Sequence, residues 1–122
     1  MHVEHITPIL NVSDLAASFA WFESLGWAKK WDWGDPPDFG AVGCGKVEIF
    51  LCLNDQGAPG GVWMSWWVRA PAEVDAIHAL ALEKGLTVTH PPTNEPWGVR
   101  EFHLRHPDGH TFRVSAGLGD CE

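Results

Sequence analysis

Residues 11–27 of the chain read NVSDLAASFAWFESLGW, a stretch that predicts one helix followed by a sharp stop. Ser13 is a favourable N-cap, and Asp14 suits the positive end of a helix. Apolar side chains then recur at helical spacing, namely Leu15, Phe19 and Phe22. Gly26 is a typical residue at which a helix ends. We therefore expect a helix near residues 14–25, with a strand on either side.

The same order of elements recurs in the second half of the chain. Lys84-Gly85-Leu86 stands about sixty residues after Leu25-Gly26-Trp27, at the end of a second helical pattern near residues 72–84. Alternation and turn residues predict four strands in each half, over residues 3–12, 27–33, 39–44 and 47–53 and over residues 62–69, 86–89, 101–105 and 111–115. A Gly/Pro-rich linker, residues 54–61, joins module 1 (residues 1–53) to module 2 (residues 62–116). This repeat predicts an α+β fold of two tandem βαβββ modules in a single domain, residues 1–122.

Composition and charge exclude several classes of protein. The 122 residues carry 16 acidic and 8 basic side chains, a net charge of −8, and lack the basic footprint of a nucleic-acid binder. No apolar run is long enough for a membrane span, and the first residues do not resemble a secretory signal, so we expect a cytoplasmic protein. The three cysteines show no CxxC spacing, which argues against a disulfide framework or a zinc knuckle.

The aromatic composition is unusual, because the chain has eight tryptophans and no tyrosine. A core needs few tryptophans, since each buried indole N–H must find a hydrogen-bond partner. We therefore expect several of them to line a surface or a cleft.

Two motifs resemble those of a known superfamily. Residues 11–27 are similar to the opening "V-x-D-L-x-x-S-x-x-F-Y-x-x-L-G-F", and residues 95–109, EPWGVREFHLRHPDG, are similar to the signature "PWG-REF…DPDG". Together with the βαβββ repeat, they resemble the vicinal oxygen chelate superfamily, which includes glyoxalase I, bleomycin resistance proteins and extradiol dioxygenases. The resemblance implies curved mixed sheets around a cavity, and a homodimer.

The resemblance also implies four positions at which metal-dependent members bind a divalent cation. The first two fall on His5 and Glu48, which can be metal ligands. The other two fall on Trp63 and Arg113, which cannot, because indole offers only an N–H donor and guanidinium is always cationic. We therefore expect no metal cofactor. The alternative is a divalent metal held by His5 and Glu48. We prefer the interpretation that these two residues form a polar pair in the cavity.

Histidines of the second half offer another set of ligands. Glu101 and His103 share one face of a strand, because Phe102 between them points to the other face. A site of these two residues is conceivable, but solvated histidines on a hairpin are the preferred interpretation for His103, His106 and His110.

Strand alternation and loop positions select the candidate ligand-binding residues. Trp63, Ser65 and Trp67 should share one face, whereas Trp66 should pack on the other. Trp97 lies in a Pro/Gly loop, and Trp31 and Phe39 bracket the loop between them. At such places the resemblance implies aromatic groups that line a groove. The candidate set is Trp31, Phe39, Trp63, Ser65, Trp67, Trp97, Glu48 and His5.

Aromatic walls bind planar or cationic groups by stacking and cation–π contacts. The leading hypothesis is therefore a metal-independent protein, similar to bleomycin resistance proteins, that sequesters a flat antibiotic or metabolite able to carry positive charge. One alternative is a metal-dependent lyase, isomerase or dioxygenase that uses His5 and Glu48. Another is a regulatory domain that uses the fold for dimerisation.

Overall fold

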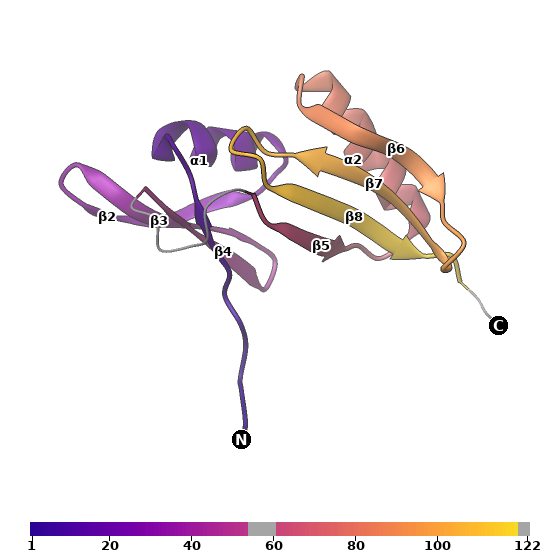
Figure 1. The fold of residues 1–122 in the computed structure, drawn as a ribbon, viewed down its shortest axis with the longest axis horizontal. Helices are drawn as coiled ribbons and strands as arrows, with labels where there is room; N and C mark the ends of the chain where they lie inside the picture. Colours follow the sequence, from indigo (N-terminus) through magenta and orange to yellow (C-terminus); the bar gives the residue numbers. More distant parts are fainter. Residues whose placement is uncertain (54–60, 120–122) are drawn as a thin grey trace. The chain divides into compact units, whose positions relative to one another are not determined.

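The computed structural model describes residues 1–53 and 61–119, and the chain divides into two compact units, residues 1–59 and 60–122 (Figure 1). The expected linker at residues 54–61 lies outside the described residues except for Gly61. No helix in the described parts of the chain is long and apolar enough to cross a membrane.

Unit 1 has one helix and a four-stranded sheet in the order β1-β4-β3-β2. The first strand pairs in parallel with the last, and the other pairs are antiparallel. Its elements are β1 (Ile9–Asn11), α1 (Leu15–Ser24), β2 (Ala28–Gly34), β3 (Pro37–Cys44) and β4 (Val47–Cys52).

Unit 2 repeats this topology, with a sheet in the order β5-β8-β7-β6 and β5 parallel to β8. Its elements are β5 (Trp63–Trp67), α2 (Pro71–Glu83), β6 (Thr87–Asn94), β7 (Val99–Arg105) and β8 (Thr111–Gly117). Both units therefore have the βαβββ order that the sequence predicts, and the predicted fold class is confirmed.

An aspartate caps the start of α1, and a glycine follows the end of each helix. The N-cap of α1 is Asp14, whose carboxylate accepts a hydrogen bond from the backbone N–H of Ala17 at 2.9 Å, so the expectation of Ser13 at this position is wrong by one residue. Gly26 and Gly85 follow the helices with φ values of 93° and 72°, a conformation that suits glycine. The stops predicted at both glycines are confirmed.

The core of each unit lies between its helix and one face of its sheet. In unit 1, Phe19 and Phe22 of α1 are buried together with Val42 and Leu51 of the sheet. In unit 2 the buried apolar side chains of α2 and the sheet include Val74, Ala81, Phe102, Leu104, Phe112 and Val114. Trp66 stacks on Phe112 with ring centroids 4.3 Å apart, so it is a packing residue, as predicted.

Two strands differ in length from the expectation. β1 covers only Ile9–Asn11 instead of residues 3–12, because Pro8 has no N–H with which to extend the ladder. β6 runs through Pro91 and Pro92 to Asn94, where a loop was expected. It is an edge strand, and proline is tolerated there because one side of the strand makes no ladder hydrogen bonds.

His106 and His110 are buried, and the expectation that they are solvated is wrong. Each is 1 % exposed, and its Nδ1 accepts a backbone hydrogen bond, from Asp108 at 3.0 Å and from Val62 at 3.1 Å respectively. Burial and the neighbouring His110 lower the pKa of His106 to about 4, although the charge of Asp108 acts in the opposite direction. His106 is therefore a neutral structural residue of the β7–β8 turn.

Gly40→Ala tests the packing of α1 on the sheet. A Cβ at Gly40 would lie 2.5 Å from the buried ring of Phe19 and 3.0 Å from the backbone oxygen of Trp31. We expect a loss of about 1–3 kcal/mol in the free energy of unfolding, measured by chemical denaturation. In the control Gly43→Ala, the new Cβ meets only the flexible chain of Lys30, so the loss should be below about 1 kcal/mol. Equal losses would contradict this account.

His106 should make the protein less stable in acid. The unfolded chain takes up this proton near pH 6.5, whereas folded His106 resists it until about pH 4. Stability is therefore lost as the pH falls through this window, by roughly 2–3 kcal/mol at pH 4.5 for this group alone. Denaturation at pH 7 and 4.5 should show a smaller loss in His106→Asn than in the wild type. The exposed His2→Asn should behave like the wild type, and an unchanged loss in His106→Asn would refute the assignment.

Candidate functional site

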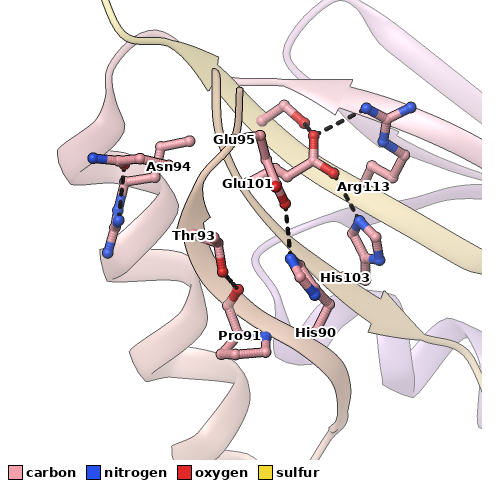
Figure 2. A network of polar contacts seen from close by, with 10 residues as sticks. His90, Pro91, Thr93, Asn94, Glu95, Glu101, His103 and Arg113 are labelled. Carbon is pink, nitrogen blue, oxygen red and sulfur yellow. Dashed lines mark hydrogen bonds and ion pairs between the residues drawn. The ribbon is translucent and has the colours of Figure 1, made fainter. Parts of the chain in front are cut away.

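Unit 2 has an open groove of about 570 Å³ on one face of its sheet. We call it the unit 2 groove. Its side chains come from β5, β6, the β6–β7 turn, β7 and β8, and they are Trp63, His90, Glu95, Trp97, Glu101, His103 and Arg113. Figure 2 shows the charged and histidine side chains of this groove converging between β6, β7 and β8.

Strand register brings these residues together on the face that α2 does not cover. Phe102 contacts His78 of α2, with ring centroids 5.3 Å apart, so Glu101 and His103 on either side of Phe102 face away from the helix. In the antiparallel pair β7–β8, His103 lies opposite Arg113. The face shared by Glu101 and His103 is thus confirmed, and it belongs to a groove.

Glu101 is the most buried charged residue of the groove, at 1 % exposure. Its Oε1 accepts hydrogen bonds from Arg113 Nη2 at 2.9 Å and from the Ser115 hydroxyl at 3.4 Å, and its Oε2 pairs with His103 Nε2 at 2.8 Å (Figure 2). Burial by itself raises the pKa of Glu101, but hydrogen bonds from Arg113 and His103, the charge of Arg113 and the nearby indole of Trp97 outweigh it and lower the pKa to about 2. The side chain is therefore a carboxylate throughout the physiological pH range.

A second carboxylate–imidazole pair lies beside the first. His90 Nε2 is 2.8 Å from Glu95 Oε2, and the His90 and His103 rings lie 4.6 Å apart between centroids. Trp63 meets the His103 ring edge to face at 5.5 Å. His103 is therefore held between an indole, an imidazole and a carboxylate. The expectation that it is a solvated surface residue is wrong.

The two tryptophans of the groove remain accessible. Trp63 is 62 % exposed and Trp97 is 61 % exposed. Trp97 stands on a tight turn in which Gly98 has a φ of 91° and its N–H donates to the carbonyl of Glu95 at 3.1 Å. Both indoles are thus anchored on the scaffold while much of their surface is available to a ligand.

The other predicted residues of β5 do not line this groove. Ser65 lies opposite Arg113 in the parallel pair β5–β8 and is half-buried, and Trp67 is exposed near the end of the strand.

Trp31 and Phe39 belong to unit 1, where they flank a β2–β3 hairpin instead of the expected longer loop. Their rings stack with centroids 5.8 Å apart, and Phe50 meets both edge to face. The three rings form an aromatic cluster on the sheet of unit 1.

His5 and Glu48 line the same smaller cavity of unit 1, with a volume of about 290 Å³. The cavity also contains Lys30 and Lys46, which place two positive charges beside any cation bound there.

The four positions that metal-dependent relatives use for a cation do not fit such a centre in this chain. Trp63 and Arg113 line the unit 2 groove, and Arg113 is engaged with Glu101. Within residues 1–53 and 61–119, no group of three or more His, Cys, Asp or Glu side chains is placed to hold one metal ion.

Sequence reasoning missed two groove residues, His90 and Glu95. The strand expected over residues 86–89 ends before His90, because two prolines follow this residue, so His90 is expected in a loop. Glu95 opens the EPWG motif, and the available signal was the position of this acidic residue two residues before Trp97 in the same turn.

The comparison with protein families identifies one match. The model of the Glyoxalase/Bleomycin resistance protein/Dioxygenase superfamily matches residues 2–114. No curated protein matches the chain significantly.

Solved structures share the fold. A glyoxalase/bleomycin resistance protein/dioxygenase from Nocardioides superposes with a TM-score of 0.78 at 19 % identity, over 100 % of this chain and 88 % of that one. Lactoylglutathione lyase from Agrobacterium tumefaciens gives 0.79 at 22 % identity, over 94 % and 95 %. A bleomycin resistance determinant encoded on the transposon Tn5 gives 0.73 at 20 % identity, over 94 % and 98 %.

Proposed function

The chain belongs to the glyoxalase/bleomycin resistance protein/dioxygenase superfamily, and we propose that it sequesters a flat, positively charged small molecule without a metal ion. The ligand would be an antibiotic or a metabolite held in the unit 2 groove. The observation that carries this proposal is the pair of exposed indoles, Trp63 and Trp97, on a groove whose polar side chains are already fixed by one another.

Stacking supplies the affinity in this proposal. An indole face attracts a planar ring by offset stacking and a cation through its negative quadrupole, and each such contact adds about 0.5–1.5 kcal/mol to area burial. Both indoles are more than half exposed in the free protein, so a ligand can bury this surface when it binds.

Charge supports a cationic ligand. With neutral histidines, the groove has two carboxylates, Glu95 and Glu101, against one guanidinium, Arg113, and thus a formal charge of −1. The whole chain carries −8 and attracts cations at longer range, which mainly increases the association rate.

Trp97→Ala tests the stacking. We expect it to raise the dissociation constant for ethidium, a flat cation, about tenfold, because one stacking and cation–π surface is removed. Ethidium fluorescence anisotropy measures the constant, and a parallel titration with a bleomycin glycopeptide tests a natural ligand of this class. The thermal midpoint should change little, since the ring is 61 % exposed.

Trp33→Ala is the matched control, because it removes a 71 % exposed indole that does not line the groove. Its dissociation constant should equal that of the wild type. An unchanged constant in Trp97→Ala, or an equal loss in Trp33→Ala, would show that binding does not use the groove.

The metal content distinguishes this proposal from the enzymatic alternative. We expect protein dialysed against Zn²⁺, Ni²⁺, Mn²⁺ or Fe²⁺ and then desalted to retain far less than one ion per chain by elemental analysis. The reason is that Trp63 and Arg113 occupy two of the four positions where metal-dependent relatives would have ligands. In addition, the positive charges of Lys30 and Lys46 lie in the same cavity as His5 and Glu48. Retention of about one ion, lost in both His5→Ala and Glu48→Ala, would instead support a lyase, isomerase or dioxygenase.

A further inference from the structure

We infer that Glu101 is the positioning residue of the unit 2 groove: its buried carboxylate fixes the orientation of His103 and Arg113, and through His103 that of Trp63, and thereby sets the affinity for flat ligands. The inference rests on the proposed function for its binding consequence, whereas its geometric part can be tested in the free protein.

The carboxylate accepts hydrogen bonds from two neighbouring strands. Arg113 Nη2 and the Ser115 hydroxyl reach it from β8, at 2.9 and 3.4 Å, and His103 Nε2 reaches it from β7 at 2.8 Å. His103 in turn meets the ring of Trp63, from β5, edge to face at 5.5 Å. One anion thus connects the groove residues of β7 and β8 and, through His103, that of β5.

Glu101 acts on a ligand through these partners and not by contact. Its side chain is only 2 % exposed, whereas those of Arg113 and His103 are 35 % and 19 % exposed. Because the carboxylate accepts from His103 Nε2, it also selects the tautomer in which Nε2 carries the proton and Nδ1 has a free lone pair.

An uncharged isostere cannot replace this acceptor. A glutamine has one carbonyl oxygen, and its NH₂ group is a donor. In Glu101→Gln the NH₂ group must therefore face at least one of the donors on Arg113 or His103. The loss of charge also weakens every remaining hydrogen bond.

Glu95 provides a matched control within the same groove. It is also a carboxylate paired with one histidine, His90, at 2.8 Å. Glu95→Gln and Glu101→Gln remove the same formal charge from the groove, so both lose the same general attraction for a cation. Any further loss in Glu101→Gln measures positioning.

The binding experiment uses ethidium and the full chain. We expect Glu95→Gln to weaken binding about threefold and Glu101→Gln at least about tenfold more than Glu95→Gln. Equal effects of the two variants, with wild-type binding intact, would overturn the inference and leave the proposed function in place.

A second pair of variants leaves the buried charge untouched. Ser115→Ala and Thr93→Val each remove a hydroxyl that does not line the groove, but only the Ser115 hydroxyl donates to Glu101. We expect Ser115→Ala to weaken ethidium binding about twofold and Thr93→Val to leave it unchanged. Equal effects would count against positioning, even if Glu101→Gln failed to fold.

The free protein supplies a readout that needs no ligand. In ¹⁵N NMR spectra of the imidazoles, His103 should be protonated at Nε2 in the wild type and become a mixture of tautomers in Glu101→Gln. His90 should change only in Glu95→Gln. If ethidium and bleomycin do not bind the wild type but His103 responds in this way, the proposed function fails while the positioning geometry stands. If His103 does not respond, the inference is wrong.

Discussion

Parallel pairing of the first and last strands is the constraint on which both units depend. β1 pairs with β4 and β5 pairs with β8. In each unit the chain must therefore cross back over the sheet before it forms the last strand. A parallel pair cannot be closed by a hairpin, and the helix after the first strand provides part of this crossover. The helix covers one face of the sheet and leaves the opposite face for other uses. In unit 2, that uncovered face carries the groove.

The elements that could be predicted were those set by local chemistry. Helix positions followed from apolar spacing and from Gly26 and Gly85, whose positive φ values suit glycine. The shared face of Glu101 and His103 followed from strand alternation, which needs only the correct period. Trp63 and Trp97 were selected by their positions in a strand and a turn, and both line the groove.

The errors occurred where distant segments decide the environment of a residue. His106 and His110 occupy a polar turn, and nothing local indicates that Val62, far away in the sequence, donates a hydrogen bond to His110. β6 continues through two prolines because it is an edge strand, a property of the whole sheet. The burial of Glu101 likewise depends on Arg113 and Ser115 of the neighbouring strand. The homodimer and the cytoplasmic location stay predictions.

The donor chemistry of the groove explains how one carboxylate can organise it. Guanidinium offers N–H donors and no acceptor, and an imidazole paired with a carboxylate donates too. His103 and Arg113 can therefore share one acceptor, Glu101, without competing acceptors between them. The ring of Trp63 rests edge to face against His103 and is 62 % exposed. Because one buried anion holds His103 and Arg113 before a ligand arrives, little conformational entropy of these side chains is lost on binding, and the exposed indole surface can contribute more fully to affinity.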